Sequence, residues 1–337
     1  MENEKIRILY ITNMYPKEPG SYSGIFIKQE IDELKKLGLT IDLLFIDGHK
    51  NKFSYLNIFS FINGINKKYN LINVHYSLLL PQTIISKRIL NLDTPLIFTL
   101  HEGGLGHTIK DTDNILKHVI NSTLWRKPLL KYVNLVIAKN IETFNYLQTQ
   151  VKNIEIPTAV DTNYFRPISK EIARKKIGIK NNGLVIFFPA NINNADKNFS
   201  FVKKILPKLK NKISGNLTLL SGPQPPEKMI WFYNAADVVI FPSLYECSPV
   251  VIKEAMSCNR PLVTSNVGDI KRVIGNTYGC FVINEWNEEE YIDKILESAK
   301  ITSTNGRKRL LEQGYDWSQT AKKLYTILMT EIYQVNK

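Results

Sequence analysis

The sequence predicts an α/β protein with two doubly wound parallel sheets, and three observations lead to this fold class. Short apolar runs alternate with longer amphipathic stretches along almost the whole chain, which is the pattern of βα units around parallel sheets. The 337 residues suit about two domains, and 44% of them are hydrophobic, enough to bury two cores. A segment bracketed by Pro157 and Pro167 has neither a helical nor a strand period, so we place the domain linker there.

The first half of the chain contains five apolar runs that we predict as strands. They are residues 6–12, 41–46, 71–75, 96–100 and 135–138. A loop over residues 13–24 leads from the first strand to a helix expected over 25–37. Open α/β sheets bind phosphate at such a loop, through backbone N–H groups and the helix dipole. Gly24 is therefore a candidate contact for phosphate or acceptor; because the spacing is not Gly-x-Gly-x-x-Gly, the alternative is a simple turn.

The second half repeats the pattern and ends in a helix. Its predicted strands are residues 184–189, 217–220, 238–241, 261–264 and 281–283. Residues 317–333 should form an amphipathic helix, because Ala321, Leu324, Leu328 and Ile332 recur at intervals of three or four. We expect an N-terminal Rossmann-like domain over 1–160, a second one over 161–316, and a final helix over 317–337 that returns across the linker to the first domain.

Composition and charge narrow the possible partners and location. The net charge of +13 would suit nucleic acid, anionic lipid or phosphate-bearing substrates, or only aid solubility. We find no nucleic-acid-binding motif and the basic residues are spread along the chain, so nucleic acid is not an expected partner. No apolar run approaches the roughly 20 residues that cross a bilayer, and the first residues lack the features of a secretory signal. We expect a cytoplasmic protein whose cysteines, Cys247, Cys258 and Cys280, are reduced and bind no zinc.

Two glutamates, Glu246 and Glu254, are separated by seven residues at the transition from the strand at 238–241 to a helix. Ser248 is a favourable N-cap and Pro249 suits the first helical position, so we expect the helix to begin there. A nucleotide diphosphate would rest on the N–H groups of the first turn, leaving one carboxylate for the sugar and the other for the ribose hydroxyls. Taken alone, the pattern also fits a solvated helix residue and a loop charge.

This stretch resembles the glycosyltransferases of family 4, a retaining group with GT-B architecture, in which two Rossmann-like domains face each other across a cleft. The family signature appears here in order as Ala235-Ala236-Asp237, Pro242-Ser243, Glu246 and Glu254, Ala255-Met256, Arg260-Pro261-Leu262-Val263 and Val267-Gly268-Asp269. Residues 156–167 and 12–26 also resemble the family, less specifically. The short path from Ser221-Gly222 to residues 233–237 is similar to the subgroup of teichuronic acid biosynthesis glycosyltransferases.

The resemblance implies a metal-independent hexosyltransferase that retains anomeric configuration. It would transfer a hexose or N-acetylhexosamine from a nucleotide sugar to a hydroxyl acceptor, a lipid-linked glycan in cell-surface polysaccharide biosynthesis. The first domain would bind the acceptor and the second the donor, a UDP- or GDP-sugar that is a substrate, and no cofactor is expected. The alternative is a catalytically weak or inactive GT-B protein that binds a nucleotide sugar and supports a partner transferase.

The resemblance also implies residue roles. Lys197 would grip the diphosphate, where a fixed cation stabilises the charge that grows on the leaving group. Glu246 would face the donor sugar, and His101, which follows the strand at 96–100, would face the reacting sugar from the first domain. With Lys197, Glu246 and His101 as catalytic residues, the expected donor-binding residues are Gly24, Asn193, Lys197, Cys247, Ser248, Pro249, Val250 and Glu254.

The chain departs from the family pattern at two points of this site. An arginine usually precedes the lysine by a few residues, whereas asparagines stand here at Asn191, Asn193 and Asn194. Cys247 occupies a position where glycine is usual, and its side chain would narrow the sugar pocket. Both departures motivate the alternative of a weak or inactive protein.

Other motifs suggest a metal or a membrane. Asp111-Thr112-Asp113 resembles the Asp-x-Asp metal motif of the other major glycosyltransferase fold. It opens an expected helix, where acidic residues interact favourably with the helix dipole, and we predict no metal site.

Three segments mix basic and bulky apolar side chains, as do protein surfaces that bind anionic lipid: residues 53–61, 67–69 and 125–132. The alternative is half-buried helices with a solvated face. If these segments bind lipid, we expect the protein to attach peripherally to the inner face of the plasma membrane.

Overall fold

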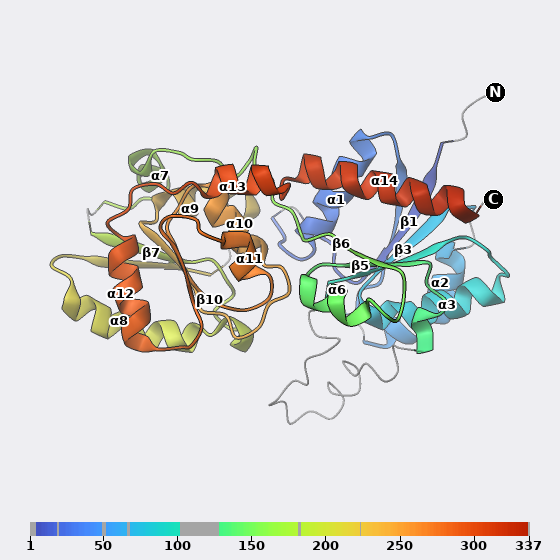
Figure 1. Ribbon diagram of the computed structural model, residues 1–337, viewed down its shortest axis with the longest axis horizontal. Coiled ribbons are helices and arrows are strands. Elements are labelled where there is room, and N and C mark those ends of the chain that lie inside the picture. The colour runs from blue at the N-terminus through green and yellow to red at the C-terminus, as the bar shows by residue number, and fades with distance from the viewer. Residues whose placement is uncertain are drawn as a thin grey trace. The chain divides into compact units, whose positions relative to one another are not determined.

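The computed structural model describes residues 5–18, 20–48, 52–65, 68–101, 128–180, 183–222 and 224–335, and it divides into two compact units (Figure 1). Unit 1 comprises the chain up to Lys17, Ser23–Pro157 and the chain from Ser318 onward. Unit 2 comprises Glu18–Tyr22 and Thr158–Trp317. A short piece of the first loop, Glu18–Tyr22, thus belongs to unit 2 and not to the unit that surrounds it in the sequence.

The described residues of unit 1 form a six-stranded parallel sheet in the order β2-β1-β3-β4-β5-β6. The strands are β1 (Arg7–Thr12), β2 (Thr40–Phe45), β3 (Leu71–His75), β4 (Leu96–Leu100), β5 (Leu135–Ala138) and β6 (Asn153–Glu155). The first five confirm the strands predicted from apolar runs, because a strand covered on both faces must be apolar throughout. We did not predict β6, whose three residues are all only half-buried.

Alternate residues of the unit 1 strands pack into two separate hydrophobic cores, one on each face of the sheet. Ile8 and Tyr10 face one core, and Leu9 and Ile11 face the other, as the two-residue period of a strand requires. The first core is covered by α1 (Ile25–Lys36) and α14 (Trp317–Val335), and the second by α2 (Ile58–Ile65), α3 (Leu80–Ile89) and α6 (Ile141–Leu147). The remaining short helices among the described residues of unit 1 are η1 (Lys52–Leu56) and η2 (Ser77–Leu79). Helix α14 buries the four residues predicted from their spacing, Ala321, Leu324, Leu328 and Ile332.

Unit 2 has a five-stranded parallel sheet in the order β11-β10-β9-β7-β8 around a single core. Its strands are β7 (Leu184–Phe188), β8 (Leu217–Ser221), β9 (Val238–Phe241), β10 (Leu262–Ser265) and β11 (Cys280–Ile283). Its helices are α7 (Lys170–Lys176), η3 (Ala195–Lys197), α8 (Phe199–Lys212), α9 (Pro226–Ala235), α10 (Val250–Ser257), α11 (Ile270–Ile274), α12 (Glu288–Ser298) and α13 (Gly306–Gln313). The two sheets confirm the predicted α/β fold class with doubly wound, Rossmann-like units.

In both sheets the strand order identifies the edge at which ligands bind. Because β7 lies between β8 and β9, the chain leaves β7 to one side and later returns to its other side. The same reversal occurs in unit 1 between β1 and β3. Open α/β sheets bind ligands in the crevice outside the carboxyl ends of the strands at such a reversal. The loops after β7 and β9 are therefore the first place to look for a site in unit 2.

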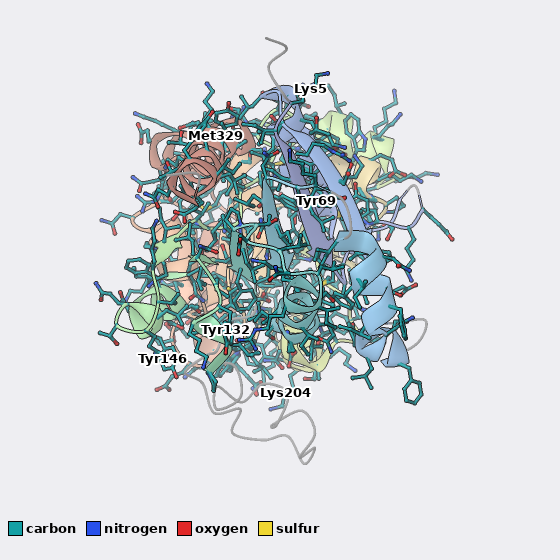
Figure 2. The ribbon with its side chains drawn as sticks, turned by 90° about the vertical axis from the view of Figure 1, so that its right-hand side faces the viewer. Lys5, Tyr69, Tyr132, Tyr146, Lys204 and Met329 are labelled. Atoms are coloured by element: carbon teal, nitrogen blue, oxygen red, sulfur yellow. The ribbon has the colours of Figure 1, made fainter. Side chains whose placement is uncertain are left out.

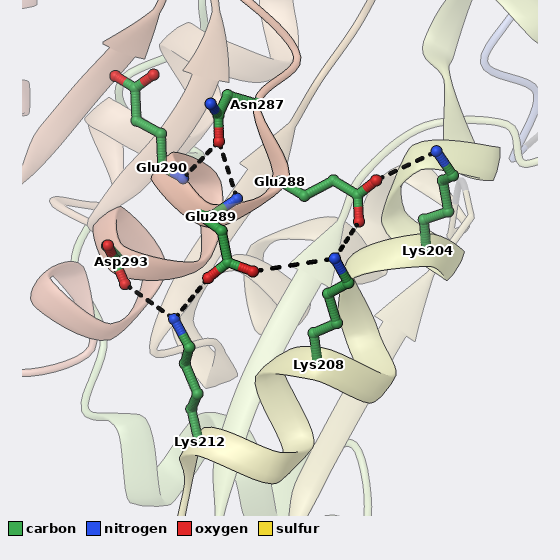
Figure 3. A network of polar contacts seen from close by, with 8 residues as sticks. All are labelled: Lys204, Lys208, Lys212, Asn287, Glu288, Glu289, Glu290 and Asp293. Carbon is green, nitrogen blue, oxygen red and sulfur yellow. Dashed lines mark hydrogen bonds and ion pairs between the residues drawn. The ribbon is translucent and has the colours of Figure 1, made fainter.

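Helix α8, which starts directly after the loop that follows β7, is tied to α12 by charged pairs on the surface (Figure 3). Lys208 lies 3.1 Å from Glu288, and Lys212 lies 2.8 Å from Glu289 and 3.3 Å from Asp293. Exposed pairs of this kind each contribute about 0.2 to 1 kcal/mol, so packing beneath them contributes more. The ion pairs add to the packing of α8 against α12.

Candidate functional site

Lys197 and Glu246 meet at the strand reversal of unit 2. Lys197 ends η3 after β7, and Glu246 follows β9, the strand that pairs with β7. The Lys197 ammonium lies 2.5 Å from Glu246 Oε1, and the Ser243 hydroxyl lies 2.8 Å from the same oxygen. Both side chains of the ion pair are largely buried, Glu246 more so than Lys197. Sequence reasoning placed both residues in the site but did not pair them with each other.

The environment of Glu246 acts on its protonation in two directions. Burial raises the pKa of Glu246 above its ordinary value, and the Lys197 charge and the Ser243 hydrogen bond oppose that shift. A carboxyl group held in this way accepts or shares a proton more readily than an exposed one. It is suited to hydrogen-bonding a sugar hydroxyl while it keeps the nearby ammonium in place.

The asparagines that stand where an arginine was expected shape the loop before Lys197. The Asn191 side-chain oxygen accepts a hydrogen bond from the Asn193 N–H at 3.0 Å, and that of Asn194 accepts from the Asp196 N–H at 3.0 Å. Asn198, at φ 56°, takes the left-handed conformation that asparagine tolerates better than most residues. Asn193, predicted to bind the donor, is exposed in this loop. Where the family has a cation, this chain thus has asparagines whose side chains stabilise the turns of the loop before Lys197.

Glu254 lies in the first turns of α10, with its carboxylate held by a buried phenol. The Tyr233 hydroxyl donates to Glu254 Oε2 at 2.6 Å. Burial raises the pKa of Glu254 to about 7, and the Tyr233 hydrogen bond acts in the opposite direction. Tyr22, which sequence reasoning did not single out, packs against the same core, and its buried hydroxyl has no hydrogen-bond partner in the described chain. Burial and the charge of Glu254 both raise the pKa of Tyr22.

The predicted start of this helix needs a correction. Helix α10 begins at Val250, and Pro249 occupies the N-cap position without a side-chain cap, so Ser248 is not the N-cap. The Ser248 hydroxyl is instead engaged by the buried residues Lys253 and Asp269, at 2.7 Å and 2.6 Å. The N–H groups of the first turn, which Val250 opens, have no partner within the helix and can receive an anion.

Cys247 lies next to Glu246 in a loop that packs closely against the connection between β10 and α11. Its carbonyl accepts a hydrogen bond from the Asp269 N–H at 3.1 Å. Gly268 has φ +57°, and a Cβ there would lie 2.5 Å from the Cys247 carbonyl oxygen. Only glycine fits at this position, which gives the Val267-Gly268 motif a physical reason.

In unit 1, His101 follows β4 and faces a second histidine that we did not predict. Its Nε2 lies 2.8 Å from Nδ1 of His75, the last residue of β3, so one proton is shared between the two nitrogens. The His101 ring also stacks on Tyr76, with ring centroids 5.1 Å apart. Burial lowers the pKa of His101 well below its ordinary value, and the charges of Lys139 and His75 act in the same direction. Burial also lowers the pKa of His75, so both rings favour the neutral form.

A buried ion pair stands beside the histidines. Lys139, which follows β5, lies 3.4 Å from Glu30 of α1, and both side chains are 2% exposed. The Tyr10 hydroxyl donates to the other Glu30 oxygen at 3.0 Å. Polar residues in otherwise apolar strands and helices are the signal that would have identified this group. Their position at the carboxyl edge of β3, β4 and β5 matches the ligand-binding edge of unit 1.

Gly24 is required by the backbone of the first loop. It has φ +66° and caps α1, accepting N–H hydrogen bonds from Ile27 and Lys28 at 3.0 Å and 3.2 Å. A Cβ at Gly24 would lie 2.3 Å from the Met14 carbonyl oxygen. The loop therefore depends on glycine for its shape, independently of any ligand.

Several predicted features fall partly or wholly outside the described residues. They are Glu102-Gly103-Gly104, Asp111-Thr112-Asp113 and residues 125–127 of the basic segment. Within the described ranges, no group of three His, Cys, Asp or Glu side chains is placed to hold a metal ion. None of the helices in these ranges is long and apolar enough to cross a membrane.

A family model and several known proteins are similar to this chain in sequence or in fold. Residues 183–300 match the family described as Glycosyl transferases group 1. A D-inositol 3-phosphate glycosyltransferase of Segniliparus rotundus is 23% identical over 202 residues. The match covers 50% of this chain and 45% of that protein. An uncharacterized glycosyltransferase of Methanocaldococcus jannaschii is 25% identical over 266 residues, 74% of this chain and 70% of its own length. The chain thus spans less than half the length of the first relative.

Solved structures share the fold over nearly the whole chain. Sucrose-phosphate synthase from Thermosynechococcus elongatus has a TM-score of 0.80 at 14% identity and covers 98% of this chain and 100% of its own. Anabaena HepE in complex with UDP and glucose has a TM-score of 0.70 at 14% identity, over 96% of this chain and 99% of its own. The chain therefore has the α/β, two-sheet architecture of GT-B glycosyltransferases.

Proposed function

Taking residues 183–300 as a glycosyl transferases group 1 domain, we propose that this protein is a retaining hexosyltransferase that needs no metal ion. It transfers a hexose or N-acetylhexosamine from a UDP- or GDP-sugar to a hydroxyl group. The acceptor in this proposal is a lipid-linked glycan of cell-surface polysaccharide biosynthesis, and a place in the teichuronic acid biosynthesis subgroup is part of it.

The observation that carries the proposal is the grouping of Lys197, Glu246 and the first turn of α10 at the strand reversal of unit 2. An ammonium and unpaired helix N–H groups provide positive charge for a diphosphate, as an anion site at a helix N-terminus requires. Glu254 lies farther along α10, where its carboxylate accepts from ribose hydroxyls. These residues bind the two ends of a nucleotide sugar within one unit.

The proposed chemistry follows from where charge develops. As the glycosidic bond breaks, negative charge grows on the leaving diphosphate, and Lys197 with the α10 N–H groups stabilises it. In the front-face route to retention, the acceptor attacks from the side that the nucleotide leaves, and the leaving phosphate oxygen receives the acceptor proton. Lys197 must then be shared between the diphosphate and Glu246. The raised pKa of Glu246 lowers the cost of that sharing, because its carboxyl group is more easily protonated.

A first experiment is a transfer and hydrolysis assay with purified protein and a panel of nucleotide sugars. A thermal shift with UDP, GDP, ADP and dTDP selects the base, because a ligand that binds only the folded state raises the midpoint. The HepE structures contain UDP and UDP-glucose, so UDP is the first nucleotide to test. Nucleotide binding without donor hydrolysis or transfer would favour the alternative, a GT-B protein that supports a partner transferase. The asparagines before Lys197 and Cys247 motivate that alternative.

Peripheral attachment to an anionic membrane is a further part of the proposal, and unit 1 supports it. Residues 48–92 contain no Asp or Glu but six basic residues, Lys50, Lys52, Lys67, Lys68, Lys87 and Arg88. Exposed apolar side chains occur in the same stretch: Phe53 is 75% exposed, Phe59 73% and Ile89 60%. Figure 2 looks onto the side of unit 1 where α2 and α3 lie. Exposed aromatic groups among cations are what an interfacial surface needs, and the protein would remain on the cytoplasmic side of the membrane.

A further inference from the structure

A buried polar cluster joins the loop and the helix that form the proposed diphosphate site in unit 2. Lys253, in α10, and Asp269, before α11, are both fully buried, and their charged groups lie 3.4 Å apart. The Ser248 hydroxyl bridges them, donating to Asp269 Oδ2 at 2.6 Å and accepting from Lys253 at 2.7 Å. It also accepts from the Thr158 N–H at 3.2 Å. The mechanism described above uses none of these three side chains.

The cluster connects three segments that surround the site. Ser248 belongs to the loop that carries Glu246, and Lys253 precedes Glu254 in α10. Asp269 belongs to the connection after β10, and its backbone N–H holds the Cys247 carbonyl at 3.1 Å. The loop is thus attached to Asp269 twice, through its backbone at Cys247 and through its side chain at Ser248. Lys253 ties both attachments to the first turns of the helix.

As a device for stability alone, the cluster is inefficient. Removing two charges from water costs several kcal/mol per ion, and apolar residues of similar volume often replace such a pair without loss of stability. Burial lowers the pKa of Lys253, and Asp269 opposes that shift only in part. The second carboxylate oxygen, Asp269 Oδ1, is buried with no hydrogen-bond partner in the part of the chain that the structure describes. The cluster does orient the loop relative to α10, because hydrogen bonds are directional whereas apolar contacts are not.

We propose that Lys253, Asp269 and Ser248 are positioning residues that hold the 246–249 loop and the N-terminal turn of α10 in register for the donor diphosphate. This inference rests on the proposed function. Lys253 and Asp269 are fully buried and act through the backbone of the loop and the helix. Ser248, which the sequence predicts as a donor contact, acts here through its hydrogen bonds to both of them. The cluster therefore contributes to nucleotide affinity and turnover more than to folding.

A double variant separates positioning from folding. Lys253→Met alone leaves Asp269 as an uncompensated buried charge, which is strongly destabilising by itself. Lys253→Met with Asp269→Leu replaces both charged groups by apolar side chains of similar shape, so we expect a melting midpoint closer to that of the wild type than the midpoint of Lys253→Met alone. We expect its dissociation constant for UDP, or for GDP if thermal shift selects that base, to rise about tenfold or more, because the loop loses its directional contacts. Ser248→Ala keeps the ion pair but not its link to the loop, and should have a smaller effect in the same direction.

Lys170→Met is the matched control. Lys170 lies 2.5 Å from Asp237, and Arg174 holds the other oxygen of that carboxylate at 2.7 Å, so the carboxylate stays paired in the variant. This ion pair belongs to α7 and the start of β9, at the opposite edge of the sheet from the site. The control should leave the nucleotide affinity unchanged.

The measurements are calorimetric titration with the nucleoside diphosphate and steady-state kinetics with the matching nucleotide sugar, beside thermal unfolding. A folded double variant that binds and turns over like the wild type would overturn the inference while leaving the proposed function intact. A double variant that is more stable than Lys253→Met but still binds the nucleoside diphosphate more weakly than the wild type supports the inference. If the wild type bound no nucleoside diphosphate, the proposed function and this inference would both be wrong.

Discussion

The ammonium group of Lys197 forms an ion pair with Glu246 at 2.5 Å, and the Ser243 hydroxyl approaches the same carboxylate oxygen. The residue proposed to stabilise the leaving diphosphate is therefore already paired with the residue proposed to face the sugar. In the proposed mechanism, binding of a donor divides the ammonium between two anions. The ion pair would then link diphosphate binding to the protonation of Glu246.

Lys197→Ala should lower kcat by about 10²-fold, because it removes a cation that stabilises charge growing in the transition state. Donor KM should change less. The removal also leaves Glu246 buried without its cation, so circular dichroism and thermal unfolding must accompany the steady-state kinetics. Wild-type turnover in a folded Lys197→Ala protein would contradict the assignment.

Glu254 should make stability depend on pH. Since its folded pKa is raised to about 7 from an ordinary value of 4.5, the folded state holds this proton more tightly than the unfolded chain. Its stabilising contribution is present below pH 4.5 and is lost as the pH rises to about 7. Glu254→Gln should remove this part of the slope when the melting midpoint is followed across that range. An unchanged slope in the variant would show that other groups cause it.

The same carboxylate should make nucleotide binding pH-dependent. Ribose hydroxyls donate more strongly to the ionised form, so the affinity of the wild type for UDP should rise through pH 7. In Glu254→Gln the affinity should be lower, by about 1.5 to 3 kcal/mol at pH 8, and should follow only the ionisation of the phosphate itself. Titration calorimetry at several pH values tests this, and parallel curves for both proteins would count against a ribose contact.

His101→Ala should impair turnover and leave nucleoside diphosphate binding nearly intact, because His101 lies in unit 1 whereas the proposed donor-binding residues from Asn193 to Glu254 lie in unit 2. His75→Ala removes the partner 2.8 Å away and should lower kcat in the same direction by a smaller factor. Calorimetry with UDP beside kinetics separates the two effects. Loss of nucleotide binding in folded His101→Ala would place this residue on the donor side instead.

Activity should survive EDTA, since in the proposed mechanism Lys197 and the first-turn N–H groups of α10 supply the positive charge that a metal ion supplies in other transferases. The assay compares initial rates before and after chelation, with added magnesium or manganese as the control. Activity that disappears in chelator and returns with metal would refute this prediction.

Vesicle binding should depend on the exposed aromatic residues of unit 1. The protein should sediment with phosphatidylcholine vesicles that contain phosphatidylglycerol, less in high salt, and Phe53→Ser with Phe59→Ser should weaken this binding. Ile172→Ser is the matched control, because Ile172 is 58% exposed on α7 of unit 2. Equal binding by the double variant and the wild type would exclude this surface.

Much of the fold could be predicted because its strands are buried on both faces. The apolar runs at Leu71–His75, Leu96–Leu100, Leu135–Ala138 and Val238–Phe241 coincide with β3, β4, β5 and β9. Strand β6 was missed since a half-buried edge strand of three residues carries no apolar pattern. The N-cap at Ser248 was predicted wrongly because local preference favours a serine cap, whereas its hydroxyl bonds to buried charges brought there by folding.

The sequence by itself determined the α/β class and the alternating elements, because these follow from local periodicity. The candidate residues Lys197, Glu246, Glu254 and His101 came from the resemblance of its motifs to a known family. Only the tertiary structure decided their partners. Glu246 pairs with a residue 49 positions away, His75 with one 26 away, and Lys139 with one 109 away. Such pairs depend on which strand ends the sheet brings together, and a buried polar group bonds to whatever packing places beside it, which no local pattern specifies.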